Sequence, residues 1–180
     1  MNKIINKLKI NIYADGANIK EFKKLNKLKF IKGFTTNPSL MKKNNITNFK
    51  QFAIKVSKIV YPKPVSFEIF TDDLREMYNQ SLIISSWYKN IFVKIPIVNS
   101  KGKSTIKVVH QLLKQKVKCN VTAIFDIKQL KPFKEIEKTK TSLILSVFCG
   151  RIADSGVDPV PKISEIIKKF RHNKNIKVLW

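Results

Sequence analysis

The chain has 180 residues, of which 43% are hydrophobic and 10% aromatic, and this composition excludes a disordered protein. The formal net charge of +24 points toward anionic partners, because a strong basic field is the electrostatic footprint of phosphate binding. However, 33 of the 36 basic residues are lysine and they are spread along the whole chain, whereas nucleic-acid recognition favours the planar arginine fork. We therefore expect no nucleic-acid partner, and a field that helps gather small anionic substrates.

Targeting and metal signals are weak. Lysines at positions 3, 7 and 9 interrupt the N-terminal stretch, so we expect no signal peptide, and no apolar run approaches the length of a membrane span. These features predict a cytoplasmic protein without a membrane partner. Cys119 and Cys149 lie in separate apolar segments without nearby histidines, so neither a zinc site nor a disulfide framework is indicated. No metal or cofactor is expected.

Strand-like and helix-like segments alternate along the chain. Runs rich in β-branched and aromatic residues predict seven strands, at residues 9–14, 29–36, 65–70, 91–96, 118–122, 142–148 and 177–180. Helical periodicity between them predicts six helices, at residues 18–27, 47–60, 72–88, 103–116, 126–137 and 160–170. Residues suited to N-caps stand near five of the helix starts: Asn18, Thr47, Thr71, Ser104 and Asp126. Pro38 and Pro161 are suited to the first turn of a helix.

A repeated βα unit with apolar strands predicts a parallel sheet covered by helices, either an open doubly wound sheet or a closed (β/α)8 barrel. Polar residues favour the barrel, because in a barrel the carboxyl ends of all strands converge on one axis. Such residues stand at or near the carboxyl ends of six successive strands: Asp15, Asn37, Glu68, Lys94, Thr122 and Ser146. We expect one α/β barrel domain over residues 1–180.

Lys94 lies inside the apolar run "IFVKIP" at residues 91–96. An unpaired ammonium group is costly to bury, so such a lysine is paired, reaches solvent, or is held as a neutral nucleophile for carbonyl carbon. Glu68, one strand earlier, could move protons for it, and Asp15 could act as a second acid or base. A buried ion pair between Lys94 and Glu68 without catalytic role would leave the same pattern, and the sequence pattern alone leaves both readings open.

Five motifs resemble the transaldolase family in order and spacing, and together they cover essentially the whole chain. They are "ADGAN" at 14–18, "GFTTNPSL" at 33–40, "VKIP" at 93–96, "CNVTAIF" at 119–125 and "SVFCGRIAD" at 146–154. The resemblance implies a TIM barrel of the class I aldolase type that acts on sugar phosphates in the pentose phosphate pathway. One departure is Val147, where the resemblance leads us to expect proline.

The resemblance also implies a role for each motif residue. Lys94 would form a Schiff base with the ketose donor, and Asp15 would exchange a proton with the donor hydroxyl. Glu68 and Thr122 would hold the water that shuttles protons. The remaining residues would bind substrate: Asn37, Ser146 and Asn120 at donor hydroxyls, Phe148 in the pocket and Arg151 at the phosphate.

The family includes transaldolases and fructose 6-phosphate aldolases. Glu68 and Phe148 resemble the transaldolase branch, since the aldolase branch has glutamine and tyrosine at these positions. The implied reaction transfers dihydroxyacetone from sedoheptulose 7-phosphate or fructose 6-phosphate to glyceraldehyde 3-phosphate or erythrose 4-phosphate. An aldolase-like lyase or an inactive family member is the alternative, and a basic nucleic-acid-binding protein is a remote one.

The sequence stops at "KVLW", inside the seventh predicted strand. A closed barrel needs an eighth strand and a closing helix, so we expect a C-terminally truncated barrel with low stability and little turnover. The oligomeric state is left open, and a homo-oligomer is compatible with the sequence.

Overall fold

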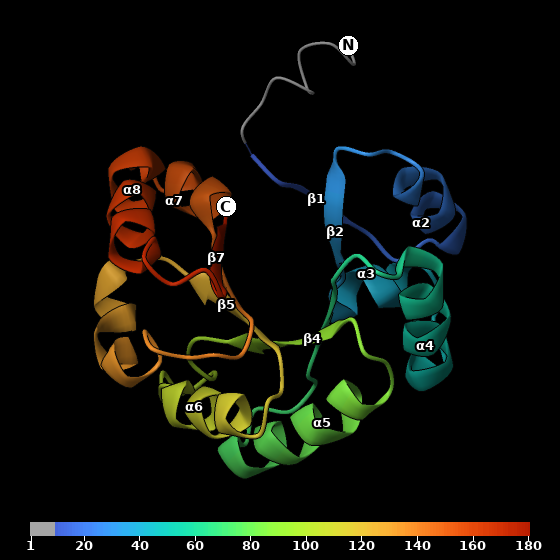
Figure 1. Ribbon diagram of the computed structural model, residues 1–180, viewed down its shortest axis with the longest axis horizontal. Helices are drawn as coiled ribbons and strands as arrows, with labels where there is room; N and C mark the ends of the chain where they lie inside the picture. The colour runs from blue at the N-terminus through green and yellow to red at the C-terminus, as the bar shows by residue number, and fades with distance from the viewer. Residues whose placement is uncertain (1–9) are drawn as a thin grey trace. The chain divides into compact units, whose positions relative to one another are not determined.

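The computed structural model describes residues 10–180, apart from the side chains of residues 133–135, so the expectations for residues 1–9 lie outside it. The chain forms two compact units (Figure 1). The first unit runs to Glu68 and also contains Ile84–Phe92, and the second contains Ile69–Ile83 and Val93–Trp180. No helix in the described residues is both long enough and apolar enough to cross a membrane.

The first unit contains three parallel strands that pair in chain order. They are β1 (Ile12–Asp15), β2 (Ile31–Thr35) and β3 (Val65–Glu68). The connections between them are helical: α2 (Ile19–Asn26), α3 (Pro38–Lys43) and α4 (Phe49–Val60). In Figure 1 these helices lie together on one side of β2.

The second unit repeats the same plan. It contains β4 (Ile91–Pro96) from Val93 onward, and then β5 (Cys119–Ile124), β6 (Leu143–Val147) and β7 (Ile176–Leu179), which pair in parallel and in chain order. Its helical segments include most of α5 (Leu74–Ser86), α6 (Ile106–Lys114), the 3-10 helix η1 (Ile127–Glu135), α7 (Cys149–Asp154) and α8 (Pro159–Phe170).

The strand order identifies the fold class. An open doubly wound sheet reverses its strand order at a switch point, whereas a barrel keeps the order of the chain. Neither unit contains a reversal, and β3 follows the same rule, since Val65 N donates to Asn90 O in the first unit and Ile69 N to Lys94 O in the second. The predicted (β/α)8-barrel class is confirmed, with seven of its strands in the described residues.

Aromatic side chains build the core of the first unit. The Phe22 ring lies 5.3 Å from Phe34 and 6.4 Å from Phe52 between ring centroids, and Phe52 lies 6.2 Å from Phe67. Tilted and edge-to-face pairs of this kind are stabilising beyond the apolar area that they bury. The cluster therefore fixes α2 and α4 against β2 and β3.

The strands of the second unit have one apolar face and an opposite face on which polar residues gather. Val93 and Ile95 in β4, Val121 in β5 and Leu145 in β6 are fully buried. Because side chains alternate along a strand, the residues between them point to the opposite face. That opposite face, called the polar face below, carries Lys94, Asn120, Thr122 and Ser146, together with the buried Ile144.

Gly33 is required where β1 and β2 pair, because the ring of its register partner Tyr13 lies directly over it. Burial raises the pKa of the Tyr13 hydroxyl above its ordinary value. A Cβ on residue 33 would lie 2.6 Å from Tyr13 Cδ1, far inside van der Waals contact. We expect Gly33→Ala to lower the free energy of unfolding by about 1–3 kcal/mol in urea titrations.

Gly16→Ala is the matched control in the same unit, because a Cβ at residue 16 meets no atom closer than 3.8 Å. It should leave the urea midpoint nearly unchanged. Equal effects from both substitutions would contradict the packing role of Gly33.

Four local predictions are wrong. The helix predicted at 126–137 is a 3-10 helix over Ile127–Glu135 rather than an α-helix, and Pro132 inside it explains why, since proline removes a backbone donor. The N-cap of α4 is Asn48 rather than Thr47, and the N-cap of α6 is Thr105 rather than Ser104. Asp73 rather than Thr71 accepts hydrogen bonds from the first turn of α5. The caps expected at Asn18 and Asp126 are confirmed.

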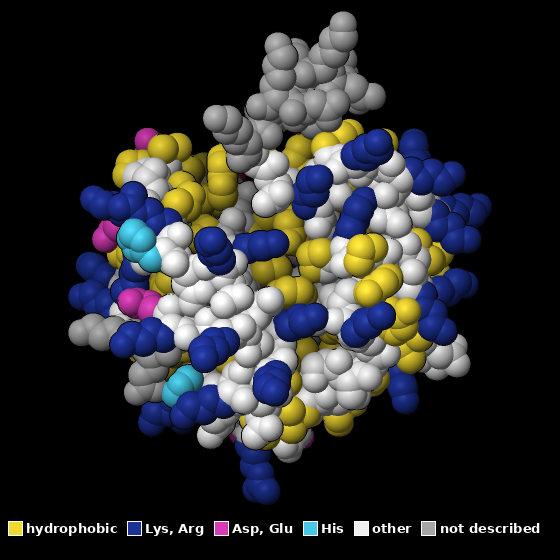
Figure 2. Space-filling view, in the orientation of Figure 1, with side chains coloured by type: hydrophobic (Ala, Val, Ile, Leu, Met, Phe, Trp, Pro, Cys, Tyr) yellow, Lys and Arg dark blue, Asp and Glu magenta, His cyan; other side chains and the backbone are white. Residues whose placement is uncertain are grey.

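Charge is distributed as the sequence indicates. Figure 2 shows Lys and Arg side chains scattered over the visible face, with few Asp and Glu side chains among them. A spread of this kind is typical of a surface filled with lysine rather than of one dedicated basic patch.

Candidate functional site

Asp15 ends β1, and its carboxylate is exposed to solvent. Its register partner Thr35, at the end of β2, donates a 2.7 Å hydrogen bond from Oγ1 to Asp15 Oδ1. Gly16 N donates to Thr35 O at 3.1 Å, which fixes the backbone on the other side of the carboxylate. The Thr35 hydroxyl therefore orients one oxygen of the Asp15 carboxylate, Oδ1.

Asn37 and Glu68 are the other two predicted site residues of the first unit. Asn37 is the N-cap of α3, where its Oδ1 accepts a 2.9 Å hydrogen bond from Leu40 N. This structural role, which sequence reasoning missed, leaves the Asn37 Nδ2 group as the part that could reach a ligand. Glu68 is the last residue of β3 and is half-buried.

Lys94 lies in the middle of β4 with only 8% of its surface exposed. Its register partner on β5 is Asn120, which is fully buried. Register partners on parallel strands point to the same face, so the Lys94 amine and the Asn120 amide leave the sheet side by side. The prediction that Lys94 is a buried strand lysine is confirmed.

Ser146 joins the same face from β6. Its Oγ donates a 2.8 Å hydrogen bond to Asn120 Oδ1, and this bond is buried. A buried hydrogen bond between side chains of neighbouring strands holds both groups in one orientation. Lys94, Asn120 and Ser146 thus come from three consecutive strands and meet on one polar face of the second unit.

Thr122 lies two residues after Asn120 on β5 and is 2% exposed. Within the described residues its Oγ1 is buried and has no hydrogen-bond partner. A buried hydroxyl in this state costs free energy unless a ligand or a water molecule completes its hydrogen bonds. The sequence analysis predicted Thr122 as a site residue, but it could not predict that the Thr122 hydroxyl is buried without a hydrogen-bond partner in the described part of the chain.

A β-bulge follows Thr122. The register between β5 and β6 shifts between Val121 and Ile124, and Ala123 has a φ of 58°. A left-handed residue other than glycine or asparagine costs of the order of 1 kcal/mol, and bulges are common beside active sites, where they redirect a side chain. The bulge sets the direction in which β5 leaves Thr122, and the alanine gave no sequence signal for it.

Phe148 follows β6 and is half-buried. Its backbone N donates to Ile124 O at 2.8 Å, and its ring packs edge to face on Phe125 with centroids 5.7 Å apart. Gln129 Oε1 accepts hydrogen bonds from the backbone of Phe125 and of Asp126, which fixes the turn after β5. The sequence analysis did not identify Phe125, which packs against Phe148, or Gln129, which fixes the turn after β5.

Arg151 is the remaining predicted site residue of the second unit. It lies on α7, which begins directly after Phe148, and its side chain is 73% exposed. Asp154 accepts a 3.5 Å contact from it one helical turn later. An exposed ion pair of this length is weak, so the guanidinium can exchange this partner for another anion.

A polar clamp fixes the loop after β4. Asp72 accepts hydrogen bonds from Ser100 N at 2.7 Å and from Ser100 Oγ at 2.6 Å, and these bonds hold the pKa of the Asp72 carboxyl below its ordinary value. Asn99 Oδ1 accepts from Lys101 N and Lys103 N. The segment "NSKGKS" at residues 99–104 is therefore an ordered loop between β4 and α6.

Sequence comparison places the chain among known proteins. Residues 12–180 match the family described as Transaldolase/Fructose-6-phosphate aldolase. A "Probable transaldolase" of Dehalococcoides mccartyi is 32% identical over 162 residues, which cover 90% of this chain and 71% of that protein. A "Probable transaldolase" of Methanococcus maripaludis is 34% identical over 161 residues, which cover 89% of this chain and 70% of that protein. The family match over nearly the whole chain agrees with the barrel topology, and the chain belongs to the transaldolase/fructose 6-phosphate aldolase family.

Proposed function

We propose that this chain transfers a dihydroxyacetone unit between sugar phosphates through a Schiff base on Lys94. The observation that carries the proposal is the burial of the Lys94 amine on the polar face that also holds Asn120 and Ser146. A lysine amine held among polar groups in a strand is placed to add to a carbonyl carbon. The surrounding amide and hydroxyl groups suit a polyol.

The chemical steps follow from the groups involved. The Lys94 amine adds to the ketose carbonyl, and loss of water from the carbinolamine gives the Schiff base. Asp15 takes the proton of the donor hydroxyl while the adjacent carbon–carbon bond breaks, which releases an aldose phosphate and leaves an enamine on Lys94. The enamine carbon then adds to the acceptor aldehyde while Asp15 returns its proton to the new hydroxyl, and water releases the new ketose phosphate and the free Lys94 amine. Thr122 and Glu68 are assigned to the water that enters and leaves these steps.

The remaining predicted residues are assigned to binding. Asn37 through Nδ2, and Asn120 and Ser146 on the polar face, would hold donor hydroxyls. Phe148 forms a wall of the pocket, and Arg151 exchanges Asp154 for the substrate phosphate. We propose sedoheptulose 7-phosphate or fructose 6-phosphate as donor, and glyceraldehyde 3-phosphate or erythrose 4-phosphate as acceptor, which places the reaction in the pentose phosphate pathway.

Borohydride trapping tests the Schiff base. Borohydride reduces an imine to a stable amine, so incubation with fructose 6-phosphate should attach a reduced three-carbon or six-carbon adduct to one lysine. Peptide mass mapping should find it on Lys94 among the 33 lysines of the chain. An adduct on a different lysine would overturn the assignment, as would its absence from an enzyme that turns over.

The reaction class is tested separately. We expect dihydroxyacetone transfer to outpace its release, because Glu68 and Phe148 both resemble the transaldolase branch. Product formation from fructose 6-phosphate should therefore rise steeply when erythrose 4-phosphate is added. Equally rapid cleavage without acceptor would assign the chain to the aldolase branch instead.

A further inference from the structure

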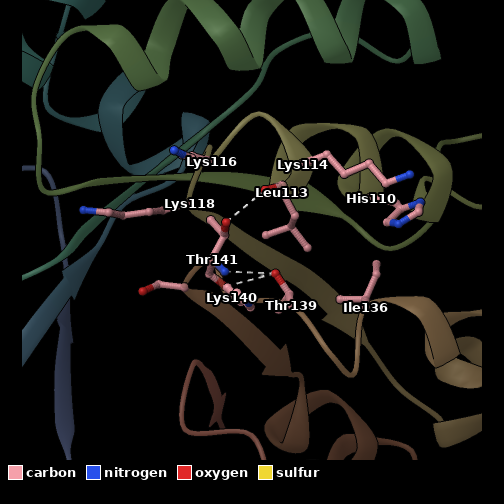
Figure 3. A pocket seen from close by; sticks show the side chains of 10 residues that line it. His110, Leu113, Lys114, Lys116, Lys118, Ile136, Thr139, Lys140 and Thr141 are labelled. Atoms are coloured by element: carbon pink, nitrogen blue, oxygen red, sulfur yellow. Dashed lines mark hydrogen bonds between the residues drawn. The ribbon is translucent and has the colours of Figure 1, made fainter.

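A groove of about 590 Å³ opens in the second unit, at the amino ends of β5 and β6 (Figure 3). In a barrel the amino ends of the strands face away from the catalytic end, where Lys94 and Thr122 belong. The buried side chains of Leu113 and Ile136 line its apolar part. The volume falls in the range of small-molecule sites in proteins.

Cations dominate the described lining of this groove. Four lysines line it together with His110, and none of the described lining residues is Asp or Glu; the lysines are Lys114, Lys116, Lys118 and Lys140. Three hydroxyl residues complete the lining: Thr139, Thr141 and Ser142. The Thr139 and Thr141 hydroxyls already donate to backbone carbonyls, so Ser142 supplies the hydroxyl that can donate to a ligand. Lys114, Lys116 and Lys140 concentrate positive charge around the groove, and this charge favours a multivalent anion that accepts hydrogen bonds.

The carbonyl end of α6 also opens here, and a helix C-terminus by itself disfavours anions. Its carbonyl groups are already occupied, however. Leu113 O accepts from Lys116 N at 3.0 Å and from Thr141 Oγ1 at 2.9 Å, and Leu112 O accepts from Val117 N at 2.9 Å. These bonds reduce the negative potential that an incoming anion would meet.

Two of the lysines are held by ordered backbone. Lys116 directly follows the α6 C-cap with a φ of 61°, a conformation that favours glycine. Lys140 lies within a turn in which Thr139 Oγ1 accepts from Thr141 N at 3.1 Å and donates to Thr141 O at 3.3 Å. Lys116 therefore lowers the stability of the folded protein relative to glycine at the same position.

A neighbouring groove indicates how long the anion is. It shares Thr139 and Lys140 with the first groove, but Glu137 lines it and accepts a 3.0 Å salt bridge from Lys169. This carboxylate interrupts the positive lining, which disfavours a long polyanion that would run through both grooves. A compact ligand confined to the first groove fits the charges better.

We propose that the groove lined by Lys114, Lys116, Lys118 and Lys140 binds a compact polyphosphate chain of two or three phosphates. The ligand is either inorganic polyphosphate or the phosphate tail of a nucleotide, and both offer the same chemistry to lysines and hydroxyls. This site is separate from the transfer reaction, so its test requires no turnover.

Isothermal titration calorimetry of the full chain with inorganic tripolyphosphate and with ATP tests the proposal. The titrations are made at about 150 mM salt, because this ionic strength screens the diffuse charge of the protein. We expect saturable binding with one site for each chain. Comparable affinities would assign recognition to the phosphate chain alone, and clearly tighter ATP binding would add the nucleoside; both results support the site. Single-stranded RNA that binds more tightly than either probe would overturn the compact ligand, and so would the absence of saturation at millimolar concentrations.

Matched charge variants separate the groove from the general field. Lys114→Gln with Lys140→Gln should weaken tripolyphosphate binding at least tenfold. Lys20→Gln with Lys23→Gln, two exposed lysines of α2 in the other unit, removes the same charge and should change affinity less than twofold. Equal losses from the two pairs would mean that only the net charge matters, which contradicts a built site.

Lys116→Gly provides a second readout with the opposite sign for stability. Glycine relieves the left-handed backbone and should raise the melting temperature, while loss of the ammonium group weakens tripolyphosphate binding. Asn45→Gly relaxes another left-handed position, with a φ of 53° in the first unit, and should leave binding unchanged. A stabilised Lys116→Gly protein with unchanged affinity would overturn the assignment of Lys116 to the site.

Discussion

Replacing Lys94 with methionine is expected to remove transfer activity while the protein remains folded. Without the amine no Schiff base forms, and loss of the nucleophile in a covalent enzyme costs on the order of 10⁶-fold in kcat. Methionine has nearly the length of the buried lysine stem and needs no polar partner, so the packing around β4 should survive. The measurement is the rate of fructose 6-phosphate turnover with erythrose 4-phosphate as acceptor.

The control for this substitution is Lys107→Met, an exposed lysine of α6. It removes the same charge and should leave kcat within about twofold, because an isolated surface substitution away from the site perturbs little. Melting curves of both variants distinguish lost chemistry from lost structure. Substantial turnover by a folded Lys94→Met protein would refute Schiff-base catalysis at this residue.

The order of the elements was predictable because strand and helix leave different periods in a sequence. The apolar run at 91–96 matches β4 at both ends, and the helix predicted at 160–170 matches α8 to within one residue. The missed helices α3 and α7 have only six residues each. Six residues span less than two turns, so no amphipathic period can build up over them.

The site was predictable in its residue types but not in its local geometry. The polar residues at the strand ends are visible in the sequence because they interrupt apolar runs. The hydrogen bond from Ser146 to Asn120 depends on strand register, which the sequence does not give. The bulge at Ala123 depends on a left-handed backbone conformation that an alanine does not predict. Asn37 illustrates how a structural and a functional role compete for one residue. Its Oδ1 caps α3, which leaves only its Nδ2 group for a substrate.

The groove lined by Lys114, Lys116, Lys118 and Lys140 could not be predicted from the sequence for a different reason. In a chain with 33 lysines, no four of them stand out by spacing. Lys116 and Lys140 line the same hollow only because the end of α6 and the turn before β6 both lie at the amino end of the sheet. Their left-handed and turn conformations are likewise properties of the folded backbone.

Asp15→Asn is expected to lower kcat by about 10²- to 10⁴-fold, the usual contribution of a positioned general acid or base. Asparagine keeps the size of the side chain and can still accept the hydrogen bond that Thr35 Oγ1 donates at 2.7 Å, so the geometry is retained and only proton transfer is lost. Because Asp15 is exposed, the change should have little effect on stability. Borohydride trapping on Lys94 should persist, since Schiff-base formation precedes the step assigned to Asp15.

Thr35→Val separates the proton transfer from the positioning of the carboxylate. Valine has the same shape as threonine but removes the hydroxyl that orients Asp15 Oδ1, so we expect a loss of roughly tenfold, equivalent to one hydrogen bond to a charged group. If Asp15 is the base, the Asp15→Asn variant must lose far more activity than Thr35→Val and must accumulate the trapped adduct. Equal and small losses of kcat in the two variants would mean that Asp15 only binds substrate. Removal of a group that only binds substrate loses no more than the free energy of the contact that the group makes.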